Sequence, residues 1–372
     1  MNEAPLHLIR REVRAERAYR VPTAQATAKL DQNESPFDLP ADVKRRILEQ
    51  WVAYEWNRYP DDRPHRLIAG LADVLNHPAD GIIVGNGSNE IVHTLGLAMM
   101  GRDVPVVLPR PMFALFESVA RMHGSQVVPV EASGTHFRHD AGQILNAARE
   151  SKAAVTIVTT PNNPTGQAIS LDALELLARE VPGFLLIDEA YHEFVDGPTS
   201  ETLVARYPNV LVLRTFSKAM GLAGVRLGYL LGATEVIQEI EKARLPFMVD
   251  AGAEAIGLAI LVNRKAIRDR AMELRAERER VEGRLQELEG VDVVPGAANF
   301  FLMRTSLSSA KLIDRLIGFD IRVRNMANYP ALAPSESSTG YVRVSAGSQE
   351  ENDRFLEAMA DILQHERVSS AS

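Results

Sequence analysis

Short apolar runs alternate with amphipathic segments through the middle of the chain. Four such runs, at 104–108, 154–158, 184–187 and 210–213, are rich in Val, Ile and Leu, and helical patterns such as that over 171–180 lie between them. Runs that are apolar at successive positions are typical of strands buried on both faces. Their alternation with helices predicts an α/β fold with a mostly parallel sheet covered by helices.

The pattern changes towards both ends of the chain. The region from about 252 to 289 is helical and carries Glu and Arg at i, i+4 spacings, which suits a long connecting helix. The residues after it mix short strands with helices and predict a smaller α+β domain. We therefore predict an N-terminal arm over 1–40 that packs on the small domain or a partner, a large domain over 41–255 and a small domain over 256–372.

A polar segment follows each of the four apolar runs. These segments are Pro109–Phe113, Pro161–Gly166, Asp188–Tyr191 and Thr215–Gly228. In open parallel sheets, ligands bind beyond the C-terminal ends of the strands. We therefore expect the four segments, although distant in sequence, to converge on one crevice.

Lys218 lies in the most unusual of these segments. A lysine amine reacts with carbonyl groups when it is neutral, and a partly buried site favours that form. The hydroxyls of Thr215 and Ser217 and the guanidinium of Arg226 suit a bound phosphate. An amine beside a phosphate cradle is what pyridoxal phosphate requires. From these residues alone, a surface lysine in a polar turn stays open as the alternative.

A nucleotide-binding motif and an acyl-enzyme motif fit this segment less well than a pyridoxal-phosphate site does. A Walker loop needs the lysine after the glycines, and here Lys218 precedes them. The S-x-x-K motif needs serine at position 215, which is threonine.

A second candidate for phosphate contact is Gly87-Ser88-Asn89. A short apolar strand leads into it and a helical pattern follows. A glycine turn at a helix N-terminus offers free amides and a positive dipole end to an anion. The dinucleotide fingerprint G-x-G-x-x-G is excluded, because position 90 is glutamate. A plain helix cap at Ser88 is the alternative.

The remaining polar segments offer partners for a pyridoxal ring. Asp188 ends an apolar run, and a partly buried carboxylate there needs a cation such as a protonated pyridine nitrogen. Tyr191 and Asn163 can donate hydrogen bonds to the phenolate oxygen of the ring. Phe113 offers a flat face for stacking.

Composition and charge exclude several other functions. The net charge of −8 argues against a nucleic-acid partner, and the absence of cysteine excludes thiolate metal sites and cysteine nucleophiles. No apolar run approaches the ~18 residues of a membrane helix, and the charged N-terminus lacks a signal-peptide core. We expect a cytoplasmic protein with no metal, membrane or nucleic-acid partner.

Taken together, these motifs resemble those of fold-type-I pyridoxal-phosphate aminotransferases and, among them, the histidinol-phosphate aminotransferases. The resemblance covers nearly the whole chain. Its motifs are Asn33-Glu-Ser-Pro36, Arg58-Tyr-Pro60, Pro161–Gly166, Asp188–Tyr191, Ser217-Lys218, Arg226 and Arg343-Val-Ser345. The chain departs from the family pattern at Met112, where a small hydroxyl residue is usual, at Phe113, often tyrosine, and at Gly87-Ser-Asn-Glu90.

The resemblance implies a role for each matching position. The catalytic residues would be Lys218 as the covalent anchor and proton carrier, Asp188 as the pyridinium partner and Tyr191 as a phenolate partner. The cofactor-binding residues would be Gly87, Ser88, Asn89, Phe113, Asn163, Asp188, Tyr191, Thr215, Ser217, Lys218 and Arg226, with Tyr59 of the partner subunit reaching the cofactor phosphate of a homodimer. Substrate would be bound by Asn33, Arg324 and Arg343.

The resemblance also implies a reaction, which is reversible amine transfer between histidinol phosphate and 2-oxoglutarate in histidine biosynthesis. Arg343 would bind the carboxylate of glutamate or 2-oxoglutarate, and Arg324 the phosphate of histidinol phosphate. Three alternatives are an aromatic amino-acid aminotransferase, a decarboxylase acting on threonine phosphate, and a transcription regulator that uses the fold as a sensor. Too few residues precede Asn33 for the DNA-binding domain that a regulator needs.

Overall fold

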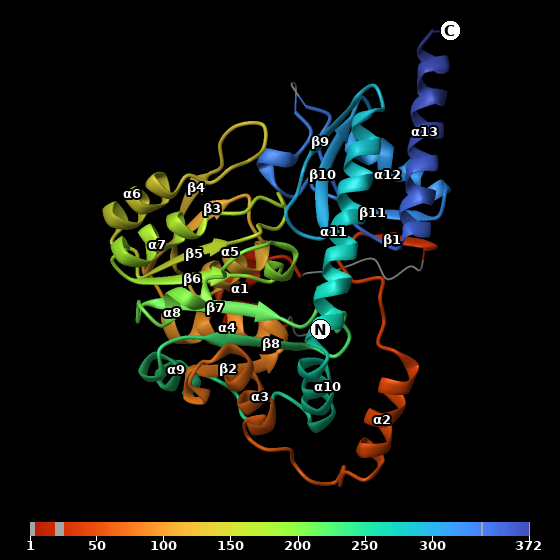
Figure 1. Ribbon diagram of the computed structural model, residues 1–372. Coiled ribbons are helices and arrows are strands. Elements are labelled where there is room, and N and C mark those ends of the chain that lie inside the picture. Colours follow the sequence, from red (N-terminus) through yellow and green to blue (C-terminus); the bar gives the residue numbers. More distant parts are fainter. Residues whose placement is uncertain (1–3, 19–25, 336–337, 372) are drawn as a thin grey trace.

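The structure is a computed structural model that describes residues 4–18, 26–335 and 338–371, and it contains two β-sheets. Figure 1 shows the larger sheet with its helices on one side of the molecule and the smaller sheet on the other, with a long helix between them. Two parts of the predicted N-terminal arm, residues 1–3 and 19–25, lie outside the described residues.

The larger sheet has seven strands in the order β2-β8-β7-β6-β5-β3-β4. All pairings are parallel except those that β8 makes with its two neighbours. The prediction of a mostly parallel sheet is confirmed. The strands are β2 (Ile82–Asn86), β3 (Pro105–Arg110), β4 (Gln126–Glu131), β5 (Val155–Thr159), β6 (Phe184–Asp188), β7 (Val210–Thr215) and β8 (Leu227–Leu231).

Helices cover both faces of this sheet, and its strands β5 and β7 are buried at every position. In β7, Val210 and Val212 belong to one hydrophobic cluster, and Leu211 and Leu213 belong to the cluster on the opposite face. The first cluster is covered by α3 (His65–Leu75), α6 (Ala141–Ser151), α7 (Leu171–Glu180), α8 (Glu201–Val204) and α10 (Ala251–Val262). The second is covered by α4 (Gly87–Met99), α5 (Ala114–Met122) and α9 (Thr234–Glu241).

The smaller sheet has five strands in the order β1-β11-β12-β10-β9. Its strands are β1 (Ala28–Leu30), β9 (Val291–Val294), β10 (Phe300–Thr305), β11 (Ile321–Asn325) and β12 (Val342–Ser345). Helices α12 (Ser309–Gly318) and α13 (Gln349–Ala371) pack with it. Because β1 pairs in parallel with β11, the chain just before Asp31 belongs to this sheet.

The expected single helix over 252–289 is two helices. Helix α10 ends at Val262, and α11 (Arg264–Gln286) begins two residues later. Between them, Asn263 leaves helical geometry and its side-chain amide donates to the carbonyl of Ala259 at 2.7 Å. Asparagine favours such helix ends because its side chain competes for the backbone hydrogen bonds. The charge pattern of the sequence did not show this break.

The remaining short elements lie outside the two sheets. They are the helices α1 (Arg11–Ala15) and α2 (Ala41–Val52) and the 3-10 turns η1 (Leu6–Leu8), η2 (Ala79–Gly81), η3 (His192–Phe194) and η4 (Pro330–Leu332). Helix α2 approaches α10 so closely that a Cβ on Gly252 would lie 1.0 Å from the ring of Trp51. No helix of the described residues is long and apolar enough to cross a membrane.

Candidate active site

The four predicted polar segments begin where β3, β5, β6 and β7 end. Parallel registers align these ends, with Thr159 opposite Asp188 and Asp188 opposite Leu213. The side chain of Asn162 donates to the carbonyl of Pro111 at 2.9 Å, which joins the segment after β5 to the segment after β3. The predicted convergence on one edge of the sheet is therefore present.

Lys218 follows β7 and its amine points to the N-terminal arm. Its Nζ donates to the carbonyl of Gln32 at 2.9 Å and lies 5.9 Å from the centre of the Tyr191 ring. Burial, with the nearby guanidinium groups of Arg343 and Arg226, lowers the pKa of Lys218 to about 8. At neutral to mildly alkaline pH a useful fraction of this amine is neutral, which is the nucleophilic form.

Asp188 is the last residue of β6 and its carboxyl is buried. Its Oδ1 accepts from the backbone N–H of Ala190 at 3.0 Å. Burial raises the pKa of Asp188 to about 7, the neighbouring Glu189 adds to the rise, and the ammonium of Lys218 opposes it. A buried carboxyl with a raised pKa becomes a stable anion when a further cation approaches it.

A buried ion pair braces the strand ends beneath these two residues. Arg214 of β7 donates through Nε and Nη2 to Glu189 Oε2, at 3.0 and 2.8 Å, and through Nη1 to Glu201 at 2.8 Å. Both Arg214 and Glu189 are buried. Removal of one partner of such a pair typically costs about 3–5 kcal/mol, since the other charge is left uncompensated. The pair therefore ties the residue after Asp188 to the residue before Thr215.

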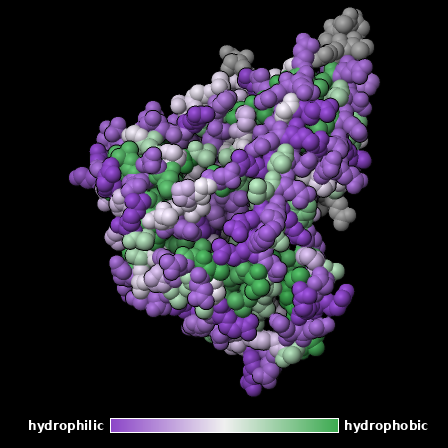
Figure 2. Space-filling model, in the orientation of Figure 1, coloured by the Kyte–Doolittle hydropathy of each residue, from purple (hydrophilic) through white to green (hydrophobic). Residues whose placement is uncertain are grey.

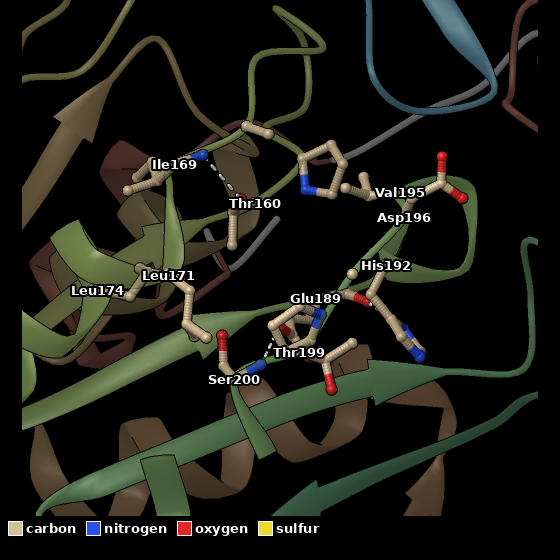
Figure 3. A pocket seen from close by; sticks show the side chains of 14 residues that line it. Thr160, Ile169, Leu171, Leu174, Glu189, His192, Val195, Asp196, Thr199 and Ser200 are labelled. Carbon is tan, nitrogen blue, oxygen red and sulfur yellow. Dashed lines mark hydrogen bonds between the residues drawn. The ribbon is translucent and has the colours of Figure 1, made fainter. Parts of the chain in front are cut away.

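Glu189 also lines a small pocket behind the strand ends, shown in Figure 3. In that view the backbone N–H of Ser200 donates to Glu189 and that of Ile169 donates to Thr160. The residues that line this pocket include neither Lys218 nor Asp188. It is therefore separate from the candidate active site.

Three hydrogen bonds link the site, the smaller sheet and the arm. The side-chain amide of Asn33 donates to the hydroxyl of Tyr191 at 3.0 Å, and its Oδ1 accepts from Ser345 of β12 at 2.9 Å. Arg343 of β12 donates through Nη1 to Asn163 Oδ1 at 2.6 Å. Residues predicted from distant parts of the chain are thus in direct contact.

A cradle for an anion forms where α4 begins. The guanidinium of Arg226 lies so near the first turn that a Cβ on Gly87 would be 2.3 Å from its Nη2. Arg226 also donates to the hydroxyl of Ser217 at 3.3 Å. A Cβ on Gly228 would be 2.3 Å from the backbone nitrogen of Ser88, so both glycines permit this approach. A guanidinium facing a positive helix end favours a bound anion such as phosphate.

Thr215 and Asn89 flank this cradle. The hydroxyl of Thr215 accepts from the backbone N–H of Ser217 at 3.1 Å and donates to the carbonyl of Leu227 at 3.3 Å. It therefore holds the start of the lysine segment. Asn89 lies in the first turn of α4 and is exposed.

Arg324 and Arg343 are cross-strand partners in the antiparallel pair of β11 and β12. Directly opposed residues in such a pair project from the same face of the sheet. Arg343 is buried and donates through Nη2 to the carbonyl of Asp31 at 2.8 Å, whereas Arg324 is partly exposed. Two guanidinium groups on one face, at different depths, can bind two anionic groups.

Phe113 and Tyr59 have contacts of another kind. Phe113 is partly exposed at the start of α5, and its ring meets the edge of the Phe116 ring at 6.3 Å. Tyr59 is 82% exposed and stacks on Phe247 at 4.8 Å. Within one chain, therefore, the described contacts do not bring Tyr59 to Lys218.

The arm and strand β12 contribute groups that the sequence analysis did not identify. The carbonyls of Asp31 and Gln32 accept from Arg343 and Lys218, and the hydroxyl of Ser345 holds Asn33. A backbone carbonyl carries no residue-type signal. Ser345 could have been found, since it belongs to Arg343-Val-Ser345, one of the motifs on which the family resemblance rests.

With this geometry established, comparison with known proteins shows the family. The family "Aminotransferase class I and II" matches residues 27–359. The chain therefore belongs to the class I and II aminotransferases, and the predicted α/β fold of this class, with its helix-covered sheet and a smaller α+β part, is confirmed.

Individual members of this family that are similar to the chain include histidinol-phosphate aminotransferases. The chain is 36% identical over 335 residues to the histidinol-phosphate aminotransferase of Chlorobaculum tepidum, covering 90% of this chain and 94% of that protein. It is 34% identical to that of Chlorobium chlorochromatii, with 96% of each chain covered. Among solved structures, the histidinol-phosphate aminotransferase of Sinorhizobium meliloti in complex with pyridoxal-5'-phosphate matches with a TM-score of 0.82 at 25% identity, over 92% of each chain.

Proposed function

We propose that the protein catalyses reversible amine transfer between histidinol phosphate and 2-oxoglutarate, with pyridoxal phosphate as cofactor. The single observation that carries this proposal is the cross-strand pair of Arg324 and Arg343, since Arg343 and the half-buried Lys218 donate to the adjacent carbonyls of Asp31 and Gln32. A dual-substrate aminotransferase must bind a phosphate and a carboxylate in turn in one pocket, and this pair offers one guanidinium for each. The names of the curated relatives support the same reaction.

The residues of the site fit pyridoxal phosphate. The cradle of Gly87, Ser88, Ser217 and Arg226 favours a phosphate, and the raised pKa of the buried Asp188 supports a role for its carboxyl as the partner of a cation. When bound, the cofactor supplies an electron sink that stabilises negative charge on the substrate α-carbon.

The chain would supply binding and proton transfer. Lys218 Nζ would anchor the cofactor aldehyde and, once released by the substrate amine, would take and return the α-carbon proton. Asp188 would hold the ring nitrogen protonated. Tyr191 and Asn163 would donate hydrogen bonds to the ring oxygen, and the ring of Phe113 would stack on the cofactor. Asn33 would orient Tyr191 through the hydrogen bond between them.

Arg324→Ala is the variant that tests the substrate. A charge-assisted bidentate contact contributes several kcal/mol, so we expect kcat/KM for histidinol phosphate to fall by about 10²-fold. The half-reaction with glutamate should change much less, because its carboxylate is assigned to Arg343. Both half-reactions can be followed by the absorbance of the cofactor-loaded protein.

Arg322→Ala is the matched control, since Arg322 lies two residues earlier on β11 and opposite Lys29 rather than Arg343. It should retain nearly full activity with both substrates. Equal losses in both half-reactions of Arg324→Ala would show that Arg324 has a structural role. Faster turnover of phenylalanine or tyrosine than of histidinol phosphate would identify an aromatic aminotransferase, and release of CO₂ without need of a keto acid would identify a decarboxylase.

The proposal includes a homodimer with shared active sites, located in the cytoplasm. Several large apolar side chains are exposed on one chain, among them Val52, Trp56, Tyr59, Leu245 and Val262. Figure 2 shows hydrophobic residues gathered in the lower half of the view, over the region of β8 and α10. Exposed apolar patches of this kind mark interaction surfaces, and a second copy would cover this one.

Mixing two inactive variants tests the shared site. If Tyr59 serves the cofactor phosphate of the other subunit, heterodimers of Tyr59→Ala and Lys218→Ala chains contain one site free of both substitutions. We expect such mixtures, after dissociation and reassociation, to regain about a quarter of the wild-type activity, because half of the dimers then hold one intact site. Verified heterodimers without activity would contradict this arrangement, as would a fully active monomer.

The proposed domain boundaries are those expected from the sequence, with an arm over 1–40, a large domain over 41–255 and a small domain over 256–372. The pairing of β1 with β11 supports an arm that packs on the small domain. The break at Asn263 between α10 and α11 lies close to the second boundary and supports its position.

A further inference from the structure

The loop after β5 and the turn between β9 and β10 meet through backbone contacts. The backbone N–H of Ala297 donates to the carbonyl of Gly166 at 2.7 Å. The side-chain amide of Gln167 donates to the carbonyl of Pro295 at 2.8 Å. The first loop extends from the seven-stranded sheet and the turn belongs to the five-stranded sheet, so these bonds join the two sheets directly.

The two backbones approach each other at a pair of glycines. Gly166 has a φ of 73°, and a Cβ built on it would lie 2.7 Å from the Cα of Gly296. A Cβ on Gly296 would lie 2.1 Å from the carbonyl oxygen of Phe300. No side chain fits between the loop and the turn, so the distance between them is set by the backbones themselves.

Two charged residues of α11 hold the turn from its other side. Oε1 of Glu282 accepts from the backbone N–H of Gly296 at 3.0 Å, and Nη1 of Arg278 donates to the carbonyl of Ala298 at 2.7 Å. The two side chains lie 3.3 Å apart, and both are buried. A buried ion pair stabilises a fold little more than apolar side chains of the same volume would. Net stability therefore does not account for this pair, and its hydrogen bonds to the turn indicate a positioning role.

The same loop and the same sheet meet a second time at the active site. Asn163 lies three residues before Gly166 and accepts from Arg343 of β12 at 2.6 Å. Strand β12 pairs with β10, which starts directly after the turn. A shift of the turn relative to Gly166 would therefore change the distance between Asn163 and Arg343.

We propose that Arg278 and Glu282 are positioning residues that hold the turn 295–298 against Gly166 and thereby place Arg343 for the substrate carboxylate. This inference rests on the proposed function. It predicts different effects on carboxylate binding and on cofactor binding, because the phosphate cradle belongs to elements of the seven-stranded sheet alone. Substitution of Arg278 or Glu282 should weaken carboxylate binding and leave cofactor binding unchanged.

The test compares Glu282→Ala with Glu279→Gln in the cofactor-loaded protein. Glu279 also contacts Arg278, at 2.8 Å, but it is exposed and no described hydrogen bond joins it to the turn. For Glu282→Ala we expect the apparent dissociation constant of glutamate in the half-reaction to rise about 10-fold, since small misplacements of a binding group have effects of this size. The limiting rate and the dissociation constant of pyridoxal phosphate should stay within about 2-fold of the wild type.

Two further variants guard against a folding defect. Glu282→Gln keeps an acceptor oxygen for Gly296 and should restore most of the glutamate affinity. Gln167→Ala removes a bond on the exposed side of the same contact and should weaken glutamate binding by a few fold, in the same direction.

Three outcomes would overturn the inference. An unchanged glutamate constant in both Glu282→Ala and Gln167→Ala would do so, and so would an equal loss of glutamate affinity and cofactor affinity. The third is an effect of Glu279→Gln as large as that of Glu282→Ala. If the unmodified protein does not react with glutamate at all, the proposed function itself is wrong. This result distinguishes failure of the proposed function from failure of the positioning role of Arg278 and Glu282.

Discussion

Lys218→Ala is expected to lower turnover at least about 10³-fold, which corresponds to about 4 kcal/mol of transition-state stabilisation. The substitution removes the nucleophile and the proton carrier together, because both functions belong to one nitrogen. The lowered pKa of Lys218, about 8, makes this amine suitable for both. Single-turnover measurements with each substrate should show the loss in both half-reactions, because both use the same proton transfer.

Chemical labelling checks the same assignment without reference to activity. Borohydride reduction of the cofactor-loaded protein, followed by peptide mapping, should place the pyridoxyl label on Lys218. Lys242→Ala is a suitable control, since Lys242 is an exposed lysine that pairs only with Glu239 in the described contacts. A label on Lys242 or on another of the chain's lysines, or an active Lys218→Ala variant, would refute the assignment.

The parallel sheet and its ligand-binding edge were predictable from the sequence, because both follow from local chemistry. A run such as Val210–Leu213 is apolar at every position, so it predicts a strand covered on both faces. Because the apolar run forms the strand, the polar residue that follows it lies at the end of that strand. That reasoning placed Asp188 and Lys218 near each other, and in the structure β6, which ends at Asp188, pairs with β7, the strand that leads to Lys218.

The parts that were missed depend on contacts between distant segments. Strand β1 is only three residues long, and it exists because β11 offers it hydrogen bonds. The contact of Asn163 with Arg343 joins residues 180 positions apart. No periodicity in the sequence encodes such a pair. The backbone carbonyls of Asp31 and Gln32 are similar cases, since any residue could provide them.

The residues around the pocket of Figure 3 show that a sequence motif does not give the surroundings of each of its side chains. Glu189 follows Asp188 in a motif that was read as catalytic, yet the two side chains have different surroundings. Glu189 pairs with Arg214 beneath the strand ends, whereas the carboxyl of Asp188 accepts from the backbone N–H of Ala190. Successive residues of a strand point to opposite faces, so one motif can supply both a reacting group and its support.

Asp188→Asn is expected to lower turnover by at least about 10²-fold, or about 2.7 kcal/mol, while the fold and much of the cofactor binding are kept. An amide has nearly the shape of the carboxylate but carries no charge, so it cannot hold the ring nitrogen protonated. Asp196→Asn serves as the matched control, because Asp196 is exposed on the loop that follows. A rate for Asp188→Asn within a few fold of the wild type would refute the role of Asp188.

Stability measurements on the cofactor-free protein provide an independent check on Asp188. Burial raises the pKa of this carboxyl from its usual range to about 7, so the folded state holds the proton more tightly than the unfolded chain does. The contribution of this group to the free energy of unfolding is therefore largest below about pH 4, falls as the pH rises to 7, and stays low above that. Asp188→Asn removes this penalty, so at pH 8 the cofactor-free variant should be more stable than the wild type by on the order of a few kcal/mol. Denaturant unfolding at pH 5 and pH 8 measures the difference, and a variant that is less stable than the wild type at pH 8 would contradict a carboxyl whose charged form is destabilised by burial.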